Sequence, residues 1–225
     1  MAVAPCEKRE SLMAEHFIVM GDVLKSRAYD GRELMREFKV LVSSCNKRLA
    51  EGISSPYTIT LGDEFQGVAR SLKWAVKTVL YLEESLLGRQ LPFALRYVVH
   101  YGRIDTPLNR MVAHGMVGPG LTRAREALTD KRRGKPRYLF DLPNARLARQ
   151  LSRLFGVMGS LSHDWQSKDS GLIVDMLESD DNTKIGFKHG KNRSQIWKRR
   201  RSLHVSDYKA LRDIAIELSE WKDLQ

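Results

Sequence analysis

Hydrophobic positions in the first 140 residues alternate between the spacings of strands and helices. The continuous apolar run 16–20 predicts a buried strand that ends at Gly21 and Asp22. Leu34, Phe38 and Leu41 begin an amphipathic helical stripe that continues to residue 49. The same reading predicts strands at 57–61, 65–68, 93–101 and 138–140, and helices at 71–87 and 118–127.

The order of these elements predicts the fold class. A β-α-β-β-α-β succession indicates an α+β, ferredoxin-like fold, in which an antiparallel sheet carries its helices on one face. After Pro143 the spacing is helical, with stripes at 147–158, 172–177 and 207–224. We therefore predict an N-terminal extension (1–15), an α/β domain (16–142) and an all-α domain (143–225).

Composition excludes several classes of protein. The chain has 225 residues, of which 42% are hydrophobic and 29% charged, so wholesale disorder is excluded. No apolar run approaches the roughly 18 residues of a membrane span, and residues 1–15 lack the apolar segment of a signal peptide. Cys6 and Cys45 are too few for a disulfide framework or a four-cysteine zinc site. These features predict a cytoplasmic protein without membrane contact.

The net charge points to a polyanionic partner. Lys and Arg number 38 against 27 Asp and Glu, a formal charge of +11. The excess gathers in two stretches, 123–137 and 184–201, and the second holds eight basic residues and no acidic one. A solvated surface is the alternative interpretation of each stretch.

Three carboxylates lie where strands end. Asp22 lies at the C-terminal end of the first strand, and Asp63 and Glu64 occupy the tip of the predicted hairpin beside it. Converging carboxylates repel one another unless a cation neutralises them, and hard oxygen ligands suit Mg²⁺ or Mn²⁺ together with substrate phosphates. Turn formation is the alternative, because Gly-Asp is a favoured hairpin dipeptide.

The segments around these carboxylates resemble a known family. Residues 60–67 (TLGDEFQG) and 21–23 (GDV) closely resemble the SatD family, and the likeness continues through 96–104 and 118–127. More distantly, they are similar to the palm domains of class III nucleotide cyclases and GGDEF-type diguanylate cyclases. The resemblance implies that Asp22 and Asp63 are metal ligands, with Glu64 as the alternative in the hairpin, and that a nucleoside triphosphate binds there.

The same resemblance implies further nucleotide contacts. Arg125 stands at the position of the catalytic arginine of cyclases, with Arg123 beside it, and Gly62 belongs to the hairpin motif of the nucleotide site. Leu121 stands where cyclases have an asparagine, four residues before the arginine.

Residues outside the resemblance are interpreted from their position alone. Lys25 and Ser26 follow Asp22 and could meet phosphate through backbone amides at the start of a helix, or could form a solvated turn. His100 is interpreted as a hydrogen-bonded histidine of the sheet.

The second basic stretch has helix-turn-helix spacing. Gly186 would let two helices approach, Gly190 would permit the turn, and Ile196 would pack the second helix back. The second helix would present five side chains to DNA: Arg193, Gln195, Lys198, Arg199 and Arg200. A basic helix pair docked on the first domain is the alternative.

Two functions follow from these observations. The first is a metal-dependent palm-like domain that binds a nucleotide and performs cyclase-like or nucleotidyl-transfer chemistry, fused to a DNA-binding helix-turn-helix. The alternative is a transcriptional regulator whose palm senses a nucleotide without catalysis. The expected partners are a nucleotide, DNA and a second copy of the chain.

Overall fold

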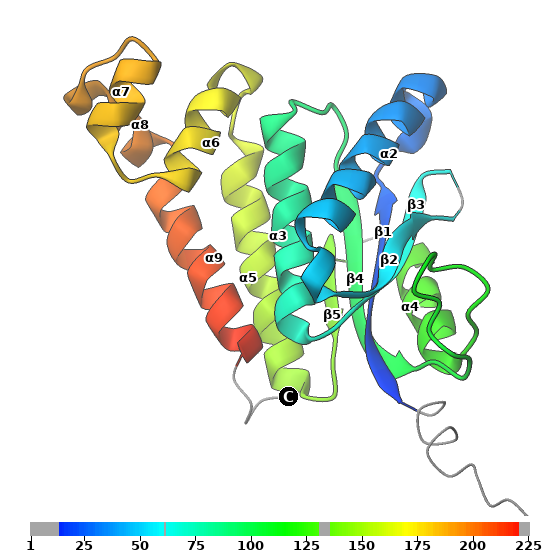
Figure 1. Ribbon diagram of the computed structural model, residues 1–225. Helices are drawn as coiled ribbons and strands as arrows, with labels where there is room; N and C mark the ends of the chain where they lie inside the picture. The colour runs from blue at the N-terminus through cyan, green and yellow to red at the C-terminus, as the bar shows by residue number, and fades with distance from the viewer. Residues whose placement is uncertain (1–13, 61, 131–135, 221–225) are drawn as a thin grey trace, which may run out of the picture.

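The computed structural model describes residues 14–60, 62–130 and 136–220 (Figure 1). Five strands form one sheet: β1 (Glu15–Val23), β2 (Ile53–Ile59), β3 (Glu64–Ala69), β4 (Leu95–Arg103) and β5 (Tyr138–Asp141). The helices of the sheet-forming half are α2 (Gly31–Arg48), α3 (Leu72–Gly88) and α4 (Pro119–Thr129). The helices that follow are α5 (Ala145–His163), α6 (Ser170–Glu178), α7 (Asn182–Lys188), α8 (Arg193–Ser202) and α9 (Val205–Glu220). The predicted α+β class is confirmed.

The strands lie in the order β2-β3-β1-β4-β5. Neighbouring strands are antiparallel from β2 to β4, whereas β5 runs parallel to β4. The sheet is therefore mixed, and the expectation of a wholly antiparallel sheet is wrong at this edge. The physical reason is the connection, because the chain passes through α4 between β4 and β5, and a crossover of this kind returns the next strand in parallel.

The two helices of the predicted β-α-β-β-α-β succession, α2 and α3, lie on one face of the sheet as expected, whereas the additional helix α4 covers the other face. Val19 of β1 belongs to the core beneath α2 and α3, and we call this side the α3 face. Ile18 and Met20 pack against Leu121 and Ala124 of α4, and we call this side the α4 face. Alternate residues of a strand point to opposite faces, so one strand serves both cores. Figure 1 shows α3 and α4 on opposite sides of the sheet.

Two strand boundaries differ from the sequence reading. β1 ends at Val23, one residue beyond the predicted end at Asp22, so Asp22 lies at the C-terminal end of the strand as expected. β2 begins at Ile53 and contains Pro56, although a proline reads as a strand breaker. β2 is the edge strand and its pairing is irregular between Ser55 and Thr58, so a missing backbone N–H is tolerated there.

The helices after residue 143 share the core of the sheet. α5 packs on β5 through Phe155, whose ring lies against Tyr138 and Phe140. α9 lies beside α3 and α5, and one hydrophobic cluster runs from Val19 to Ala215. The pair α7 and α8 projects at the far end of this layer (Figure 1). The core is thus continuous across the predicted boundary near residue 142.

Two sequence expectations concern the environment of the chain. In the ranges that the structure describes, no helix is long and apolar enough to cross a membrane. Cys45 is a free thiol in the core, and Cys6 lies outside the described residues.

Candidate functional site

Two of the three sequence-predicted carboxylate residues, Asp22 and Glu64, lie opposite each other on the α4 face. Asp22, which is 4% exposed, lies directly opposite Glu64 of β3 and Arg96 of β4. Residues directly opposite in antiparallel strands share a face, and Asp22 follows Met20 on the side covered by α4. The arrangement is a row of two acidic residues and one basic residue across three strands.

Asp63 stands outside this row. It lies in the bend before β3, where its backbone carbonyl accepts a hydrogen bond from the Val23 amide at 3.0 Å, and it is not a cross-strand partner of Asp22. The register therefore favours Glu64 over Asp63 as the partner of Asp22. No group of three or more His, Cys, Asp and Glu side chains within the described ranges could hold a metal ion. Mg²⁺ bound by only one or two carboxylates completes its coordination with phosphate oxygens and water, so a cation on this face would need a phosphate ligand.

Arg125 faces the same side of the sheet as Asp22. Its Nη2 donates a hydrogen bond to Oε1 of Gln66 at 3.0 Å, and Gln66 is two residues from Glu64 on β3. A cavity of about 270 Å³ lies beside these two side chains, lined also by Thr122 of α4 and by the loop before it. Arg123 lies on the exposed side of α4. Of the two arginines, Arg125 is thus the one placed near the carboxylates.

Lys25 and Ser26, the predicted phosphate contacts, lie at the start of a single 3₁₀ turn, Ser26–Ala28, and not at the start of an α-helix, because α2 begins only at Gly31. The carboxylate of Asp30 already accepts hydrogen bonds from the first free amides of α2, so an acidic cap occupies the place of an anion. Gly62 adopts φ +69° and forms the exposed turn of the β2–β3 hairpin.

His100 is a hydrogen-bonded residue of the sheet. Its Nδ1 lies 2.8 Å from Oδ2 of Asp141, and its side chain is buried on β4. The interpretation of this histidine as structural is confirmed.

Local capping builds the α7–α8 pair. Asp181 caps α7 by accepting hydrogen bonds from the amides of Thr183 and Lys184. Asn192 and Gln195 form a reciprocal capping box at the start of α8, with both hydrogen bonds at 2.9 Å.

Two glycines set the approach of these helices. A Cβ on Gly186 would collide with the carbonyl oxygen of Lys191, so only glycine lets the start of α8 pack there. Gly190 adopts φ +62° in the turn, a conformation that glycine takes without strain.

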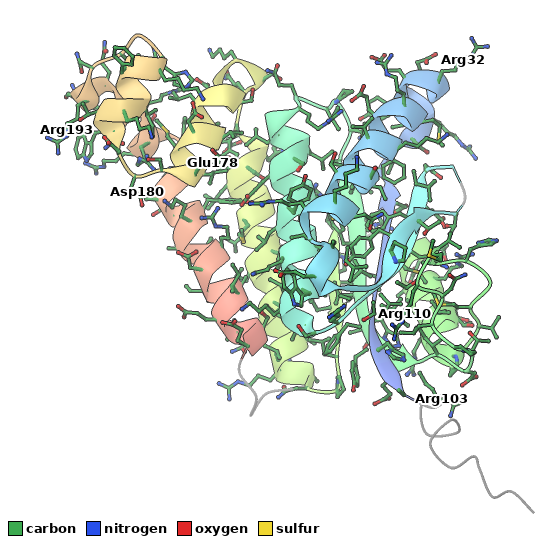
Figure 2. All side chains as sticks on the ribbon, in the orientation of Figure 1. Arg32, Arg103, Arg110, Glu178, Asp180 and Arg193 are labelled. Atoms are coloured by element: carbon green, nitrogen blue, oxygen red, sulfur yellow. The ribbon has the colours of Figure 1, made fainter. Side chains whose placement is uncertain are left out.

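The five α8 side chains assigned to DNA differ in their surroundings. Arg193, Gln195 and Lys198 are exposed, and Arg193 projects at the margin of the molecule (Figure 2). Arg199 is half-buried and pairs with Asp169.

The assignment of Arg200 to the DNA-contacting side of α8 is wrong, because this side chain is 6% exposed and faces the protein interior. Its guanidinium donates to the carbonyl oxygens of Met176 and Ser179, at 2.9 and 2.7 Å, and to Oδ1 of Asn182 at 3.0 Å. Burial lowers the pKa of this guanidinium, and the nearby Asp180 carboxylate opposes that shift. Arg200 is thus an internal anchor of α8.

Sequence reasoning missed two residues on the exposed side of this helix. Trp197 is 48% exposed, and the guanidinium carbon of Arg201 lies 5.0 Å from the centre of its indole ring. The helical period contains the signal, since at 100° per residue Trp197 and Arg201 lie about 100° and 140° around the helix axis from the buried Ile196.

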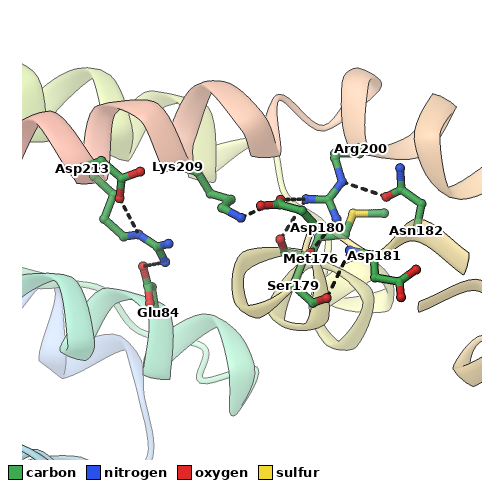
Figure 3. A network of polar contacts seen from close by, with 10 residues as sticks. Glu84, Met176, Ser179, Asp180, Asp181, Asn182, Arg200, Lys209 and Asp213 are labelled. Atoms are coloured by element: carbon green, nitrogen blue, oxygen red, sulfur yellow. Dashed lines mark hydrogen bonds and ion pairs between the residues drawn. The ribbon is translucent and has the colours of Figure 1, made fainter. Parts of the chain in front are cut away.

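Ion pairs fix α9 to the sheet-forming half and to α6–α8 (Figure 3). Arg212 of α9 donates to Glu84 of α3 at 3.3 Å. Burial raises the pKa of the Glu84 carboxyl, and Arg212 opposes that shift. Lys209 lies 2.6 Å from Asp180, which also contacts Arg200. These ion pairs therefore connect α8, through α9, to the sheet-forming half that contains Asp22 and Arg125.

The fold and these sites define an α+β protein. Its mixed sheet is covered by helices on both faces, and its helical part presents a basic helix to solvent. The chain belongs to the SatD family, whose model matches residues 16–218. A search of curated proteins finds no match to the chain.

Proposed function

We propose that this SatD-family protein binds DNA by placing α8 in the major groove. One observation carries the proposal: the side of α8 that faces solvent is basic, while Ile196 and Arg200 hold the opposite side against α6 and α7. The steric need for Gly186 and the left-handed Gly190 support interpretation of α7 and α8 as a helix-turn-helix.

The charge distribution supports a nucleic-acid partner. Residues 184–201 contain no acidic side chain, and Arg193 and Lys198 are exposed within them. Lysine and arginine that neutralise phosphates release counterions, so the affinity would fall steeply with salt. One module of this size binds weakly, and we expect two copies of the chain on half-sites about 34–36 Å apart.

Fluorescence anisotropy with a labelled duplex between about 50 and 200 mM salt tests the proposal. We expect a steep salt dependence, and the double variant Arg193→Ala, Lys198→Ala should lower affinity for every sequence and flatten the slope. The double variant Arg32→Ala, Arg36→Ala on α2 is the matched control, since it removes the same number of charges from two exposed arginines that lie away from α8 (Figure 1). Absence of binding at the lowest salt, or equal losses in the control, would overturn the proposal.

We also propose nucleotide binding on the α4 face, with Asp22 and Glu64 holding Mg²⁺ or Mn²⁺. The β2-β3-β1-β4 order and the β-α-β-β-α-β succession support a ferredoxin-like palm, and Arg125 lies on the same face. The cation would neutralise phosphate charge that two carboxylates alone would repel. Leu121 is buried and stands where cyclases have an asparagine, so this chain lacks the side-chain amide that would stabilise the transition state there. A nucleotide sensor is therefore favoured over a cyclase.

The hairpin offers a matched pair of variants for this second function. Nucleoside triphosphate binding would be measured by calorimetry with Mn²⁺ and again with a chelator, and any product would be sought by mass spectrometry. Glu64→Gln should weaken binding only when metal is present, whereas Asp63→Asn should not. Equal effects of the two variants, or of one variant with and without metal, would refute the assigned ligands. A cyclic or transferred product would favour the enzyme over the sensor.

A further inference from the structure

We infer that Trp197 and Arg201 form a base-reading pair on α8, in which Arg201 recognises a guanine and the Trp197 ring contacts a neighbouring thymine methyl. This inference rests on the proposed DNA binding and specifies how the same helix would discriminate between sequences. The two residues lie outside the set of side chains that sequence reasoning assigned to DNA.

The first support is position on the helix. Ile196, Arg200 and Leu203 are buried and define the inner side of α8. At 100° per residue, positions 197 and 201 lie about 100° and 140° from Ile196 around the helix axis, so they form one row, one turn apart, that is turned away from the inner side. Both are exposed, although an exposed tryptophan is a large apolar surface to leave in water. The outward pair is therefore available to a ligand along the groove-facing side of the helix.

The second support is a contrast among three consecutive arginines. Arg199 is paired with Asp169, and Arg200 with Asp180 and with carbonyl oxygens at the end of α6. Over the ranges that the structure describes, no carboxylate lies within ion-pair distance of Arg201. Its charge is thus not neutralised within the protein, and its contact is with the Trp197 ring at 5.0 Å.

The third support is the chemistry of a stacked arginine. A guanidinium held over an aromatic ring loses fewer conformations when it binds, so its planar fork is oriented in advance. That fork matches O6 and N7 of guanine, which is the commonest specific contact in the major groove. The exposed indole beside it is apolar and fits the thymine methyl, the apolar group of that groove. Arg193 and Lys198 would supply phosphate contacts without sequence information.

Selection of bound duplexes from a randomised pool tests the pair, followed by anisotropy on the selected duplex and on one with the guanine replaced. Arg201→Lys keeps the charge but loses the fork, so it should retain overall binding and lose the guanine preference by at least about fivefold. Trp197→Ala should reduce the preference at both positions, whereas Trp197→Phe should retain most of the guanine preference. Lys198→Ala is the control and should weaken all duplexes alike.

The outcomes separate this inference from the function on which it rests. Absence of DNA binding by the native chain at low salt overturns the proposed function. Binding without sequence preference, or a preference unchanged in both Arg201→Lys and Trp197→Ala, overturns the base-reading pair alone. Thermal melting of each variant checks that the fold is intact, which the exposure of both residues leads us to expect.

Discussion

Replacement of Arg200 by alanine should destabilise the protein far more than replacement of its neighbour Arg201. Arg200 donates to Met176 and Ser179 at the end of α6, where backbone carbonyls have no partner within the helix. Its positive charge also lies at the negative end of that helix. Alanine would remove the donor and leave these buried acceptors unsatisfied.

The magnitude follows from the contacts. A hydrogen bond that involves a charged group contributes about 1.5–3 kcal/mol, and Arg200 makes two such bonds to backbone carbonyl oxygens, those of Met176 and Ser179. Arg200→Ala should therefore lower the free energy of unfolding by about 3–5 kcal/mol. For a chain of this length the melting temperature would fall by roughly 6–20 °C. Arg201→Ala, at an exposed position, should change the free energy of unfolding by less than about 0.5 kcal/mol.

Urea unfolding followed by far-UV circular dichroism measures both variants against the native chain. The Arg200→Lys variant keeps the charge but lacks the planar guanidinium that reaches the three acceptors at once. The stability of this variant should therefore lie between those of the native chain and of Arg200→Ala. Equal stability of Arg200→Ala and Arg201→Ala would refute the assignment of Arg200 as an internal anchor. Loss of DNA affinity in Arg200→Ala without loss of stability would return this residue to the DNA-binding face.

Two further predictions concern titratable groups. Burial raises the pKa of the Asp175 carboxyl, but hydrogen bonds from Lys188 and His189 outweigh it and leave the pKa below its usual value. The carboxylate therefore stabilises the fold above its ordinary pKa and loses this effect as pH falls through the lowered one. Asp175→Asn should lower the melting temperature at pH 7 and not in strong acid; a pH-independent difference would contradict this. Burial raises the pKa of the Cys45 thiol to about 12, so in a Cys6→Ser chain a thiol reagent at pH 8 should label Cys45 only after unfolding.

The sequence by itself determined features that depend on near neighbours along the chain. The stripe at Leu34, Phe38 and Leu41 predicts α2 because the helical period alone places these residues on one face. Gly186 and Gly190 predict the α7–α8 turn because steric limits at a glycine are local. The α+β class and membership of the SatD family follow from such local patterns.

Only the tertiary structure decided which of several chemically similar neighbours is buried, which is exposed and which faces a given partner. Arg199, Arg200 and Arg201 are chemically identical in the sequence, and the packing of α8 on α6 buries the second and exposes the third. Strand register likewise places Glu64 and not Asp63 opposite Asp22, because a shift of one residue turns a side chain to the other face. The helical period places Arg200 on the side of Ile196, but the carbonyl acceptors that bury it and the strand that faces Asp22 belong to distant segments, so no local pattern contains these pairings.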